Sequence, residues 1–335
     1  MVTSRDVATY AKVSQATVSR VINGSERTSS QVESRVREAI QVLGYVRNAS
    51  ATAMKTNRSR TVGVFISEMR NPFYRDLFTE LAARLAAQKL RVMVWHAQEY
   101  ADDAVEAINE KAVDALVISA LNLESTTMMT ALKSDRPIVL LNRIVEDFAC
   151  DYVVGDNYAG SRKIADYLIA AERTDCLVIA GSLDTSTGRE RLNGFLDGMR
   201  SGGAAVPADR MVATNFDAEQ TDQTVREFIA ARGAPQTVVC VNDAQAVATL
   251  NTLRELRVDV PETTWVVGYD NVWGAETPLI NLTTVSQSYE QMADEAARIL
   301  AARLDNPTLP WIQTVLPAEL IVRGSTGNFT APRAD

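Results

Sequence analysis

Hydrogen-bonding side chains follow several short apolar runs of this sequence, at the points where strands of a sheet would end. Asn71-Pro72-Phe73-Tyr74 follows the first run, and "TGRERLNGF" at 187–195, which contains Arg191, opens a helix after a later one. The other segments of this kind are Asn142-Arg143, Asp156-Asn157, Asn242-Asp243 and Asp270-Asn271. Amide, carboxylate and guanidinium groups can bind ligand hydroxyls, and aromatic side chains can cover a ring face. The pattern favours a binding site for a polar small molecule.

The residue types argue against most catalytic and metal chemistry. His96 is the only histidine, so a site built from several histidines is impossible. It is interpreted as a surface or edge residue, with a place in a ligand cleft as the alternative. Motifs for dinucleotides, phosphate loops and serine hydrolases do not occur. We therefore expect no enzyme, no cofactor and no metal.

The three cysteines bear on the compartment of the protein. Cys150, Cys176 and Cys240 are far apart and odd in number, and their spacing suits neither zinc nor disulfides. Cys176 and Cys240 lie in apolar runs and are interpreted as core residues. With no signal peptide and no membrane-spanning run, the sequence predicts a cytoplasmic protein and argues against a true periplasmic binding protein.

Apolar runs alternate with amphipathic segments from residue 61 onward. The runs are Thr61–Ile66, Leu90–Trp95, Ala115–Ser119, Pro137–Asn142, Tyr152–Asp156, Cys176–Gly181, Thr237–Asn242, Trp265–Asp270 and Leu282–Gln287. Segments such as Phe73–Gln88 and Asp243–Leu256 carry apolar residues at helical spacing. This alternation predicts parallel sheets covered by helices, and the number of strands predicts two doubly wound α/β lobes. Ligands of such folds bind at the carboxyl ends of strands, so a cleft between the lobes would collect the polar segments.

The first sixty residues differ in charge from the rest of the chain. They contain ten Lys and Arg against four Asp and Glu, a net charge of +6, whereas the whole chain carries −8 and the remainder −14. A cationic head on an acidic body predicts a head that binds a polyanion and a body that stays away from it.

Caps and apolar spacing predict three short helices in this head. Thr3 begins the first with the form of a capping box, and Ser14 restarts a helix that Asn23-Gly24 ends. The third begins near Ser30 and ends at Gly44. Three small helices around a few apolar residues predict a helix-turn-helix domain, whose second helix enters the major groove of DNA. A generic three-helix bundle is the alternative.

The segment "DVATYAKVSQATVSRVING" resembles the DNA-binding head of the lactose-repressor and purine-repressor (LacI/GalR) family of bacterial transcription regulators. Its small residues, its S-x-x-T-V-S-R-V run and the Asn that follows carry the resemblance. The resemblance implies base contacts by Gln15, Ala16 and Arg20, because Gln pairs with adenine, Arg with guanine, and Ala can touch the thymine methyl group. The phosphate contacts that it implies are Thr3, Ser14, Thr17, Ser19 and Asn23.

The polar, weakly apolar residues 45–60, "YVRNASATAMKTNRSR", are interpreted as a linker. By the same resemblance this stretch forms a hinge helix only on DNA, where two copies pair and each inserts an apolar wedge into the minor groove. The family pattern places the wedge at Met54, where leucine is usual, and Met can serve as a wedge. A flexible linker is the alternative.

The phrases "RNPFY", "RERLNGF", "VNDAQA" and "GYDN" resemble the effector domain of this family, which is itself similar to periplasmic sugar-binding proteins. The resemblance runs from residue 3 to about 323 and implies polar anchors at Arg191, Asn242 and Asp270. It also implies a wall formed by Phe73, Arg143 and Phe216. As alternatives, Asn242-Asp243 would only end a strand and cap a helix, and Arg191 would form an ion pair between the lobes.

The sequence therefore predicts an all-α helix-turn-helix head joined to an α/β effector domain of two doubly wound parallel-sheet lobes. The expected domains are a head at 1–46, a hinge or linker at 47–60, an effector and dimerisation domain at 61–325, and a polar tail at 326–335. The first lobe would comprise about 61–157 plus 288–318, and the second about 158–287 plus 319–325.

The function expected is a repressor that binds a palindromic DNA operator as a homodimer. A small-molecule effector, a sugar or sugar derivative, would control its operator affinity. The tail shows no heptads, so no tetramerising coiled coil is expected. The alternative is a cytoplasmic sugar-binding protein or sugar-handling enzyme with an incidental helical head.

Overall fold

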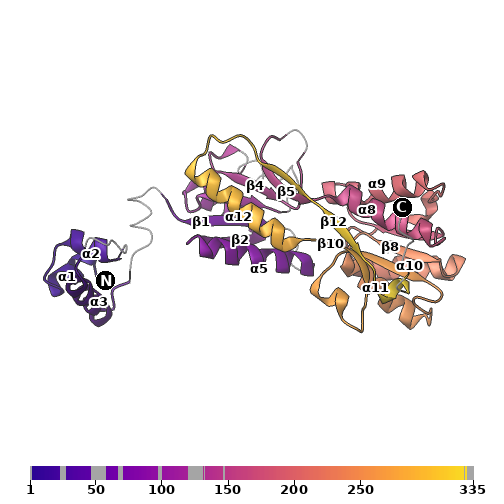
Figure 1. The fold of residues 1–335 in the computed structure, drawn as a ribbon, viewed down its shortest axis with the longest axis horizontal. Coiled ribbons are helices and arrows are strands. Elements are labelled where there is room, and N and C mark those ends of the chain that lie inside the picture. Colours follow the sequence, from indigo (N-terminus) through magenta and orange to yellow (C-terminus); the bar gives the residue numbers. More distant parts are fainter. Residues whose placement is uncertain are drawn as a thin grey trace. The chain divides into compact units, whose positions relative to one another are not determined.

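A computed structural model of the chain describes residues 2–22, 28–46, 58–66, 71–96, 100–119, 131, 133–145, 148–327 and 329 (Figure 1). The chain divides into two compact units, Met1–Ser59 and Arg60–Asp335, and each is described by itself. None of the helices in the described ranges has the length and apolar character needed to cross a membrane.

The smaller unit contains the three predicted helices, α1 (Ser4–Tyr10), α2 (Gln15–Ile22) and α3 (Ser30–Leu43). The predicted capping box is confirmed: the Thr3 hydroxyl accepts from the backbone N–H of Asp6, and the Asp6 carboxylate accepts from that of Thr3. Gly44 ends α3 in the left-handed conformation, as glycine commonly does. The apolar residues meet in one small core made of Val7, Ala8, Ala11, Val18, Val21, Val36 and Ala39.

The larger unit contains two six-stranded sheets, one in each lobe. The first sheet has the order β11-β5-β4-β3-β1-β2 and is parallel throughout. Its strands are β1 (Thr61–Ile66), β2 (Arg91–His96), β3 (Ala115–Ile118), β4 (Ile138–Leu141), β5 (Asp151–Gly155) and β11 (Gln313–Leu316). His96 ends the edge strand β2, so its interpretation as an edge residue is confirmed.

The second sheet has the order β12-β10-β9-β8-β6-β7. Its strands are β6 (Cys176–Ala180), β7 (Met211–Ala213), β8 (Thr237–Cys240), β9 (Trp265–Asp270), β10 (Thr283–Gln287) and β12 (Ala318–Ile321). The strands β10, β9, β8, β6 and β7 run parallel as predicted, whereas the edge strand β12 runs antiparallel to β10, so this sheet is mixed. The physical reason is the path of the chain: β10 runs out of the second lobe, whereas β12 enters it from the first.

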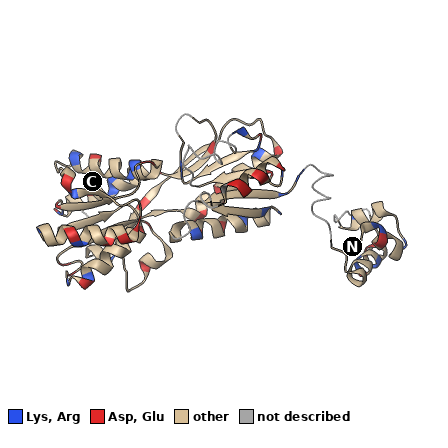
Figure 2. Cartoon of the chain, turned by 180° about the vertical axis from the view of Figure 1, so that it is seen from behind, with Lys and Arg blue, Asp and Glu red and all other residues tan. Residues whose placement is uncertain are grey.

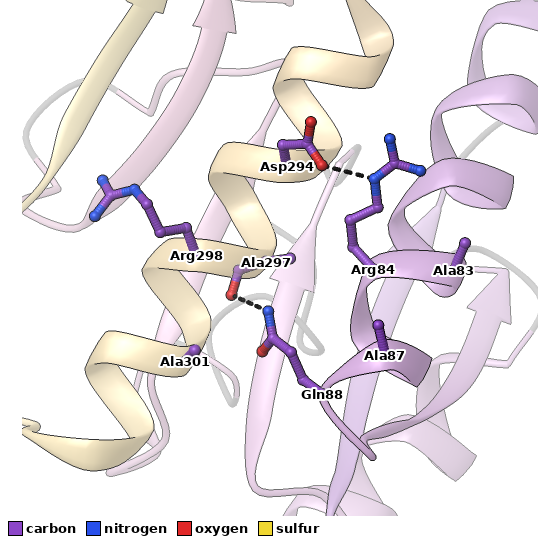
Figure 3. Close-up of a pocket in the computed structure, with 8 residues that line it drawn as sticks. All are labelled: Ala83, Arg84, Ala87, Gln88, Asp294, Ala297, Arg298 and Ala301. Atoms are coloured by element: carbon purple, nitrogen blue, oxygen red, sulfur yellow. Dashed lines mark hydrogen bonds and ion pairs between the residues drawn. The ribbon is translucent and has the colours of Figure 1, made fainter.

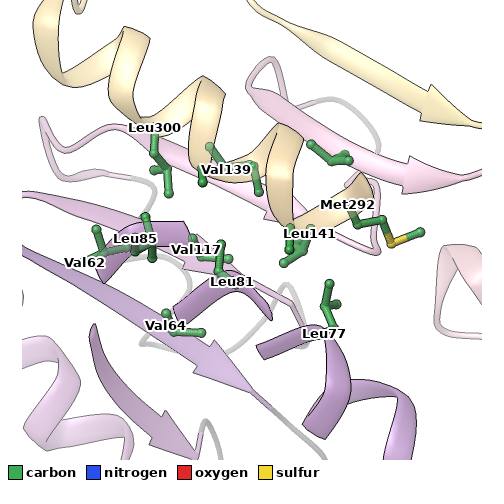
Figure 4. Close-up of a cluster of buried hydrophobic side chains, with 14 of the residues drawn as sticks. Val62, Val64, Leu77, Leu81, Leu85, Val117, Val139, Leu141, Met292 and Leu300 are labelled. Atoms are coloured by element: carbon green, nitrogen blue, oxygen red, sulfur yellow. The ribbon is translucent and has the colours of Figure 1, made fainter. Parts of the chain in front are cut away.

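Helices cover both faces of each sheet. In the first lobe α5 (Pro72–Ala87) and α12 (Tyr289–Asp305) lie side by side on one face (Figure 1), and α6 (Ala101–Asn109) packs on the other. Leucines and valines of α5, α12 and the strands form the core between them (Figure 4). In the second lobe α8 (Asn157–Ala170) and α9 (Ser186–Ser201) cover one face, and α10 (Ala218–Arg232) and α11 (Asp243–Glu255) the other.

The chain passes between the lobes three times, after β5, after β10 and at Pro317 between β11 and β12. Since β5 and β10 both run toward the other lobe, the carboxyl ends of the parallel strands of both sheets meet at the junction. The predicted binding segments follow those strands, so the fold brings them to one region. The short 3₁₀ helices η1 (Ala208–Arg210), η2 (Trp273–Glu276) and η3 (Gly324–Thr326) lie in loops of the second lobe.

Candidate functional site

The face of α2 that turns away from the core carries the predicted base-reading residues. Val18 and Val21 are buried, whereas Gln15, Ala16 and Arg20 are exposed. The Gln15 amide donates from Nε2 to the Ser4 hydroxyl at 2.8 Å, which holds its side chain beside the start of α1. An exposed polar face on a packed short helix is the geometry with which a recognition helix enters the major groove.

The predicted phosphate-binding hydroxyls lie at the starts of α1 and α2. The Thr3 hydroxyl donates to Asp6 Oδ2 at 2.8 Å, and Ser14 Oγ accepts from the backbone N–H of Thr17 at 3.1 Å. Ser14 Oγ and Thr17 Oγ1 share one further hydrogen bond of 2.9 Å. Ser19 is exposed on α2. Asn23 and Met54 lie outside the described residues.

Arg191 connects three segments at the carboxyl edge of the second sheet. Its Nε donates to Asn157 Oδ1 at 2.8 Å, and one terminal nitrogen donates to the carbonyl oxygen of Val241 at 2.6 Å. The other terminal nitrogen lies 3.0 Å from Asp270 Oδ1, and the guanidinium lies 3.9 Å above the centre of the Tyr269 ring. Both partners of the ion pair belong to the second lobe, so the alternative of an ion pair between the lobes is wrong.

Asp270 accepts hydrogen bonds from both lobes. Its Oδ1 accepts from Arg191 and, at 2.8 Å, from Gln287 Nε2, whereas Oδ2 accepts from Asn71 Nδ2 of the first lobe at 3.5 Å. The side chain is 2% exposed, and burial raises its pKa although Arg191 acts in the opposite direction. The backbone of Asp270 has a φ of 113°, a strained value for a residue with a side chain.

Asn242 and Asp243 form the start of α11. Asn242 Oδ1 accepts from the backbone N–H of Gln245 at 2.8 Å, so the capping role considered for this segment is confirmed. Asp243 is fully buried, and its Oδ2 accepts from the backbone N–H of Val272 at 2.9 Å. Burial and the nearby charge of Asp270 raise the pKa of Asp243 to about 8.

The three residues predicted to form the wall differ in their surroundings. The Phe73 side chain lies in the core of the first lobe, 1% exposed, with its ring edge-to-face on Tyr74. Phe216 is half-buried, and its ring lies against Gly181 at the end of β6, where a Cβ would overlap it. Arg143 is half-buried and follows β4 by two residues.

Four residues of this region had no role assigned from the sequence: Asn71, Asn157, Tyr269 and Gln287. Asn71 and Asn157 stand in the polar segments after β1 and β5, so their place at a strand end was the available signal. The side chains of Tyr269 and Gln287 belong to strands and read as ordinary core residues. Only the fold brings them to Arg191 and Asp270.

An open groove of about 590 Å³ lies apart from this region, between α5 and α12 (Figure 3). Alanines line its floor, and Arg84 Nε donates to Asp294 Oδ1 across it at 2.6 Å. Gln88 makes a second link to the carbonyl oxygen of Ala297. Figure 2 shows both signs of charge on the helices of the larger unit.

Comparisons with known proteins match both units. Residues 3–48 match the bacterial regulatory proteins of the lacI family, and residues 165–326 match a periplasmic binding protein-like domain. The ribose operon repressor of Escherichia coli (strain K12) is 28% identical over 329 residues, which cover 97% of this chain and all of that protein.

Solved structures with the same fold include regulators bound to ligands. The transcriptional regulator CelR in complex with cellobiose is 28% identical with a TM-score of 0.74, and the match covers 97% of this chain and 100% of that one. The lac repressor dimer bound to operator and the anti-inducer ONPF is 21% identical with a TM-score of 0.84, covering 97% and 99% of the two chains.

Proposed function

We propose that this chain is an effector-controlled transcriptional repressor. In this proposal it joins the DNA-binding domain of the lacI family of bacterial regulatory proteins to a periplasmic-binding-protein-like domain. The observation that carries the proposal is the exposed polar face of α2 on a packed three-helix core, within a segment of net charge +6. A related repressor is named for a ribose operon, and a related regulator binds cellobiose. A sugar or sugar derivative is therefore the effector that we propose.

In the proposed DNA complex, Gln15, Ala16 and Arg20 read base edges. Thr3, Ser14, Thr17, Ser19 and Asn23 contact phosphates. The Thr3 hydroxyl already donates to Asp6, so it can bind phosphate only by giving up that bond, whereas the Ser14–Thr17 pair keeps one O–H for a phosphate oxygen. Met54 is the proposed minor-groove wedge.

A homodimer is the proposed assembly. One small head covers one half-site, so two heads related by a twofold axis would read a palindrome. Phosphate contacts would make the affinity depend on salt, and base contacts would supply the specificity.

The proposed effector site comprises Arg191, Asn242 and Asp270, with Phe73, Arg143 and Phe216 around it. Two described hydrogen bonds join the lobes here: Asn71 to Asp270, and the Ile144 backbone N–H to the Ser186 hydroxyl at 3.1 Å. An effector that binds Asp270 would compete with the first of them and so change the angle between the lobes. The coupling is reciprocal, so operator DNA would change effector affinity by the same factor.

Selection of operators from a pool of genomic DNA by the purified chain tests the proposal. We expect enrichment of a palindrome, and we expect Arg20→Ala to relax the preference at one base pair of each half-site by about 1–3 kcal/mol. Arg35→Ala removes the same charge from an exposed position on α3 and should weaken binding without changing the preference. The proposal would be contradicted if no sequence is enriched either with or without a metabolite extract. It would also be contradicted if the chain converts a bound sugar into a product.

A further inference from the structure

Gln15 is tied to the first helix of the head by a hydrogen bond between side chains. Its Nε2 donates to the Ser4 hydroxyl at 2.8 Å. Ser4 is the first residue of α1, and Gln15 is the first residue of α2. The bond therefore links the starts of the two helices, where the predicted phosphate-binding hydroxyls Thr3 and Ser14 also stand.

This link leaves the base-reading groups of the Gln15 amide available. A glutamine amide has two N–H donors and a carbonyl oxygen with two lone pairs. A hydroxyl group can accept from Nε2 or donate to Oε1, so in either orientation of the amide at least one N–H and one lone pair remain. These are the groups that pair with N7 and N6 of adenine.

The same link restricts how the Gln15 side chain can turn. Glutamine has three side-chain torsions, and ordering such a side chain on a partner costs conformational entropy. Gln15 is exposed, and within the described part of the chain its side chain has no hydrogen bond other than the one to Ser4. The Ser4 bond thus orders the amide before DNA binds, which lowers the cost of reading one base edge and disfavours a turn toward another.

Arg20, the other long base reader, differs in this respect. It is exposed on the same helix, and no hydrogen bond or ion pair joins its side chain to another described residue. The described residues therefore hold one of the two long base readers in place and leave the other unheld. Arg20 serves as an internal reference for any effect that acts through Ser4.

Ser4 is not required for the fold of the head. The cap of α1 is Thr3, whose hydroxyl and backbone N–H form the capping box with Asp6. Ser4 does not belong to the apolar core of the head, and alanine is the best helix former. Ser4→Ala should therefore keep α1 folded and remove only the link to Gln15.

We propose that Ser4 is a specificity-determining residue of the DNA-binding head, which acts by positioning the Gln15 amide on its base pair. This inference rests on the proposed function. It adds to the base readers a residue that holds one of them, and it assigns Ser4 no contact with the base itself.

Operator selection with the full chain and its variants tests the inference. The base pair that Gln15 reads is the one whose preference Gln15→Ala removes. We expect Ser4→Ala to relax the preference at this base pair by about two- to tenfold, which is the range that one net hydrogen bond contributes. The preference at the base pair that Arg20 reads should not change.

Three further variants separate positioning from a general effect on the head. Ser4→Thr retains the hydroxyl and should restore the preference. Thr9→Ala removes another α1 hydroxyl, which bonds only to the Arg5 carbonyl of its own helix, and should behave as wild type. In a chain that already carries Gln15→Ala, Ser4→Ala should have no further effect, because the two residues act as one unit.

The inference is overturned if Ser4→Ala leaves the preference at the Gln15 base pair intact, or if its effect persists in the Gln15→Ala chain. It is also overturned if Ser4→Ala weakens binding to all sequences equally, which is the behaviour of a phosphate contact.

A measurement without DNA separates the inference from the proposed function. In the full chain labelled with ¹⁵N-glutamine, the side-chain amide signal of Gln15 is the one that Gln15→Ala removes. We expect Ser4→Ala to shift this signal and Thr9→Ala to leave it in place. An unmoved signal overturns the inference whether or not an operator is found. A shifted signal without any selected operator overturns it through the proposed function on which it rests.

Discussion

Replacing Asp243 by asparagine tests whether the second lobe holds an uncompensated carboxyl group. Asp243 is fully buried and receives hydrogen bonds from the Thr284 hydroxyl and the Val272 backbone. The charged groups that act on it are Asp270 and Arg191, and Arg191 lies on Asp270. Asparagine has nearly the same shape, keeps an acceptor for the Val272 N–H, and can donate to the Thr284 oxygen. The substitution therefore removes the ionisation and retains the packing.

The magnitude follows from the pKa of Asp243, which burial raises from 3.8 to about 8. The folded chain binds this proton more tightly than the unfolded chain, so stability falls as the pH rises between the two values. One pKa unit corresponds to about 1.4 kcal/mol, so between about pH 5 and about pH 8 this residue should lower the free energy of unfolding by about 4 kcal/mol. Asp243→Asn should not show this loss.

Urea denaturation of wild type and variant at both pH values measures the difference. Asp270, whose pKa is also raised, is present in both proteins, so the comparison reports the ionisation of Asp243 together with its coupling to Asp270. We expect the variant to be more stable than wild type at about pH 8, with a much flatter pH dependence. The exposed Asp166→Asn serves as the control and should follow wild type. Equal pH dependence in wild type and Asp243→Asn would refute the reasoning.

Two further predictions concern the strand ends. Gly181→Ala should displace the Phe216 ring, because the new Cβ would overlap it. Calorimetry should then show effector affinity lowered by about tenfold or more, with operator binding retained. Gly274→Ala is the control and should leave effector and operator binding unchanged, because its Cβ would meet its nearest neighbour at 3.6 Å. Asn71→Asp keeps the cap of α5 but places a like charge opposite Asp270, which should move the lobes apart. X-ray scattering should therefore give a larger radius of gyration for Asn71→Asp than for Asn71→Ser. Equal radii would contradict the hydrogen bond between Asn71 and Asp270.

The predicted strands and the strands that were not predicted occupy different positions in the sheets. Central strands such as β1, β4 and β9 are buried on both faces, so they appear as continuous apolar runs. The three strands without a predicted run, β7, β11 and β12, are all edge strands of three or four residues. Gln313–Leu316 alternates exposed and half-buried residues. An edge strand needs no apolar run, and its pairing is a property of the assembled sheet.

The candidate site was predictable only in part, for a similar reason. The rule that ligands bind at the carboxyl ends of parallel strands selects Asn242 and Asp270 from their place after apolar runs. It cannot give the partners of Arg191, because Asn157, Val241 and Tyr269 come from separate elements that only the fold assembles. The burial of Phe73 in the first lobe was likewise invisible, since a helical aromatic residue reads equally as core or as ligand wall.

The contacts at the junction explain how a small ligand could change the relation of the lobes. A ligand shifts a conformational equilibrium only through contacts that differ between the two states. Asp270 Oδ1 is held within its own lobe by Arg191 and Gln287, whereas Oδ2 reaches Asn71 of the other lobe. A hydroxyl group that takes Oδ2 therefore leaves the second lobe intact and exchanges only the inter-lobe bond. Arg191 and Gln287 hold the Asp270 carboxylate through Oδ1, so it stays in place while its partner across the junction changes.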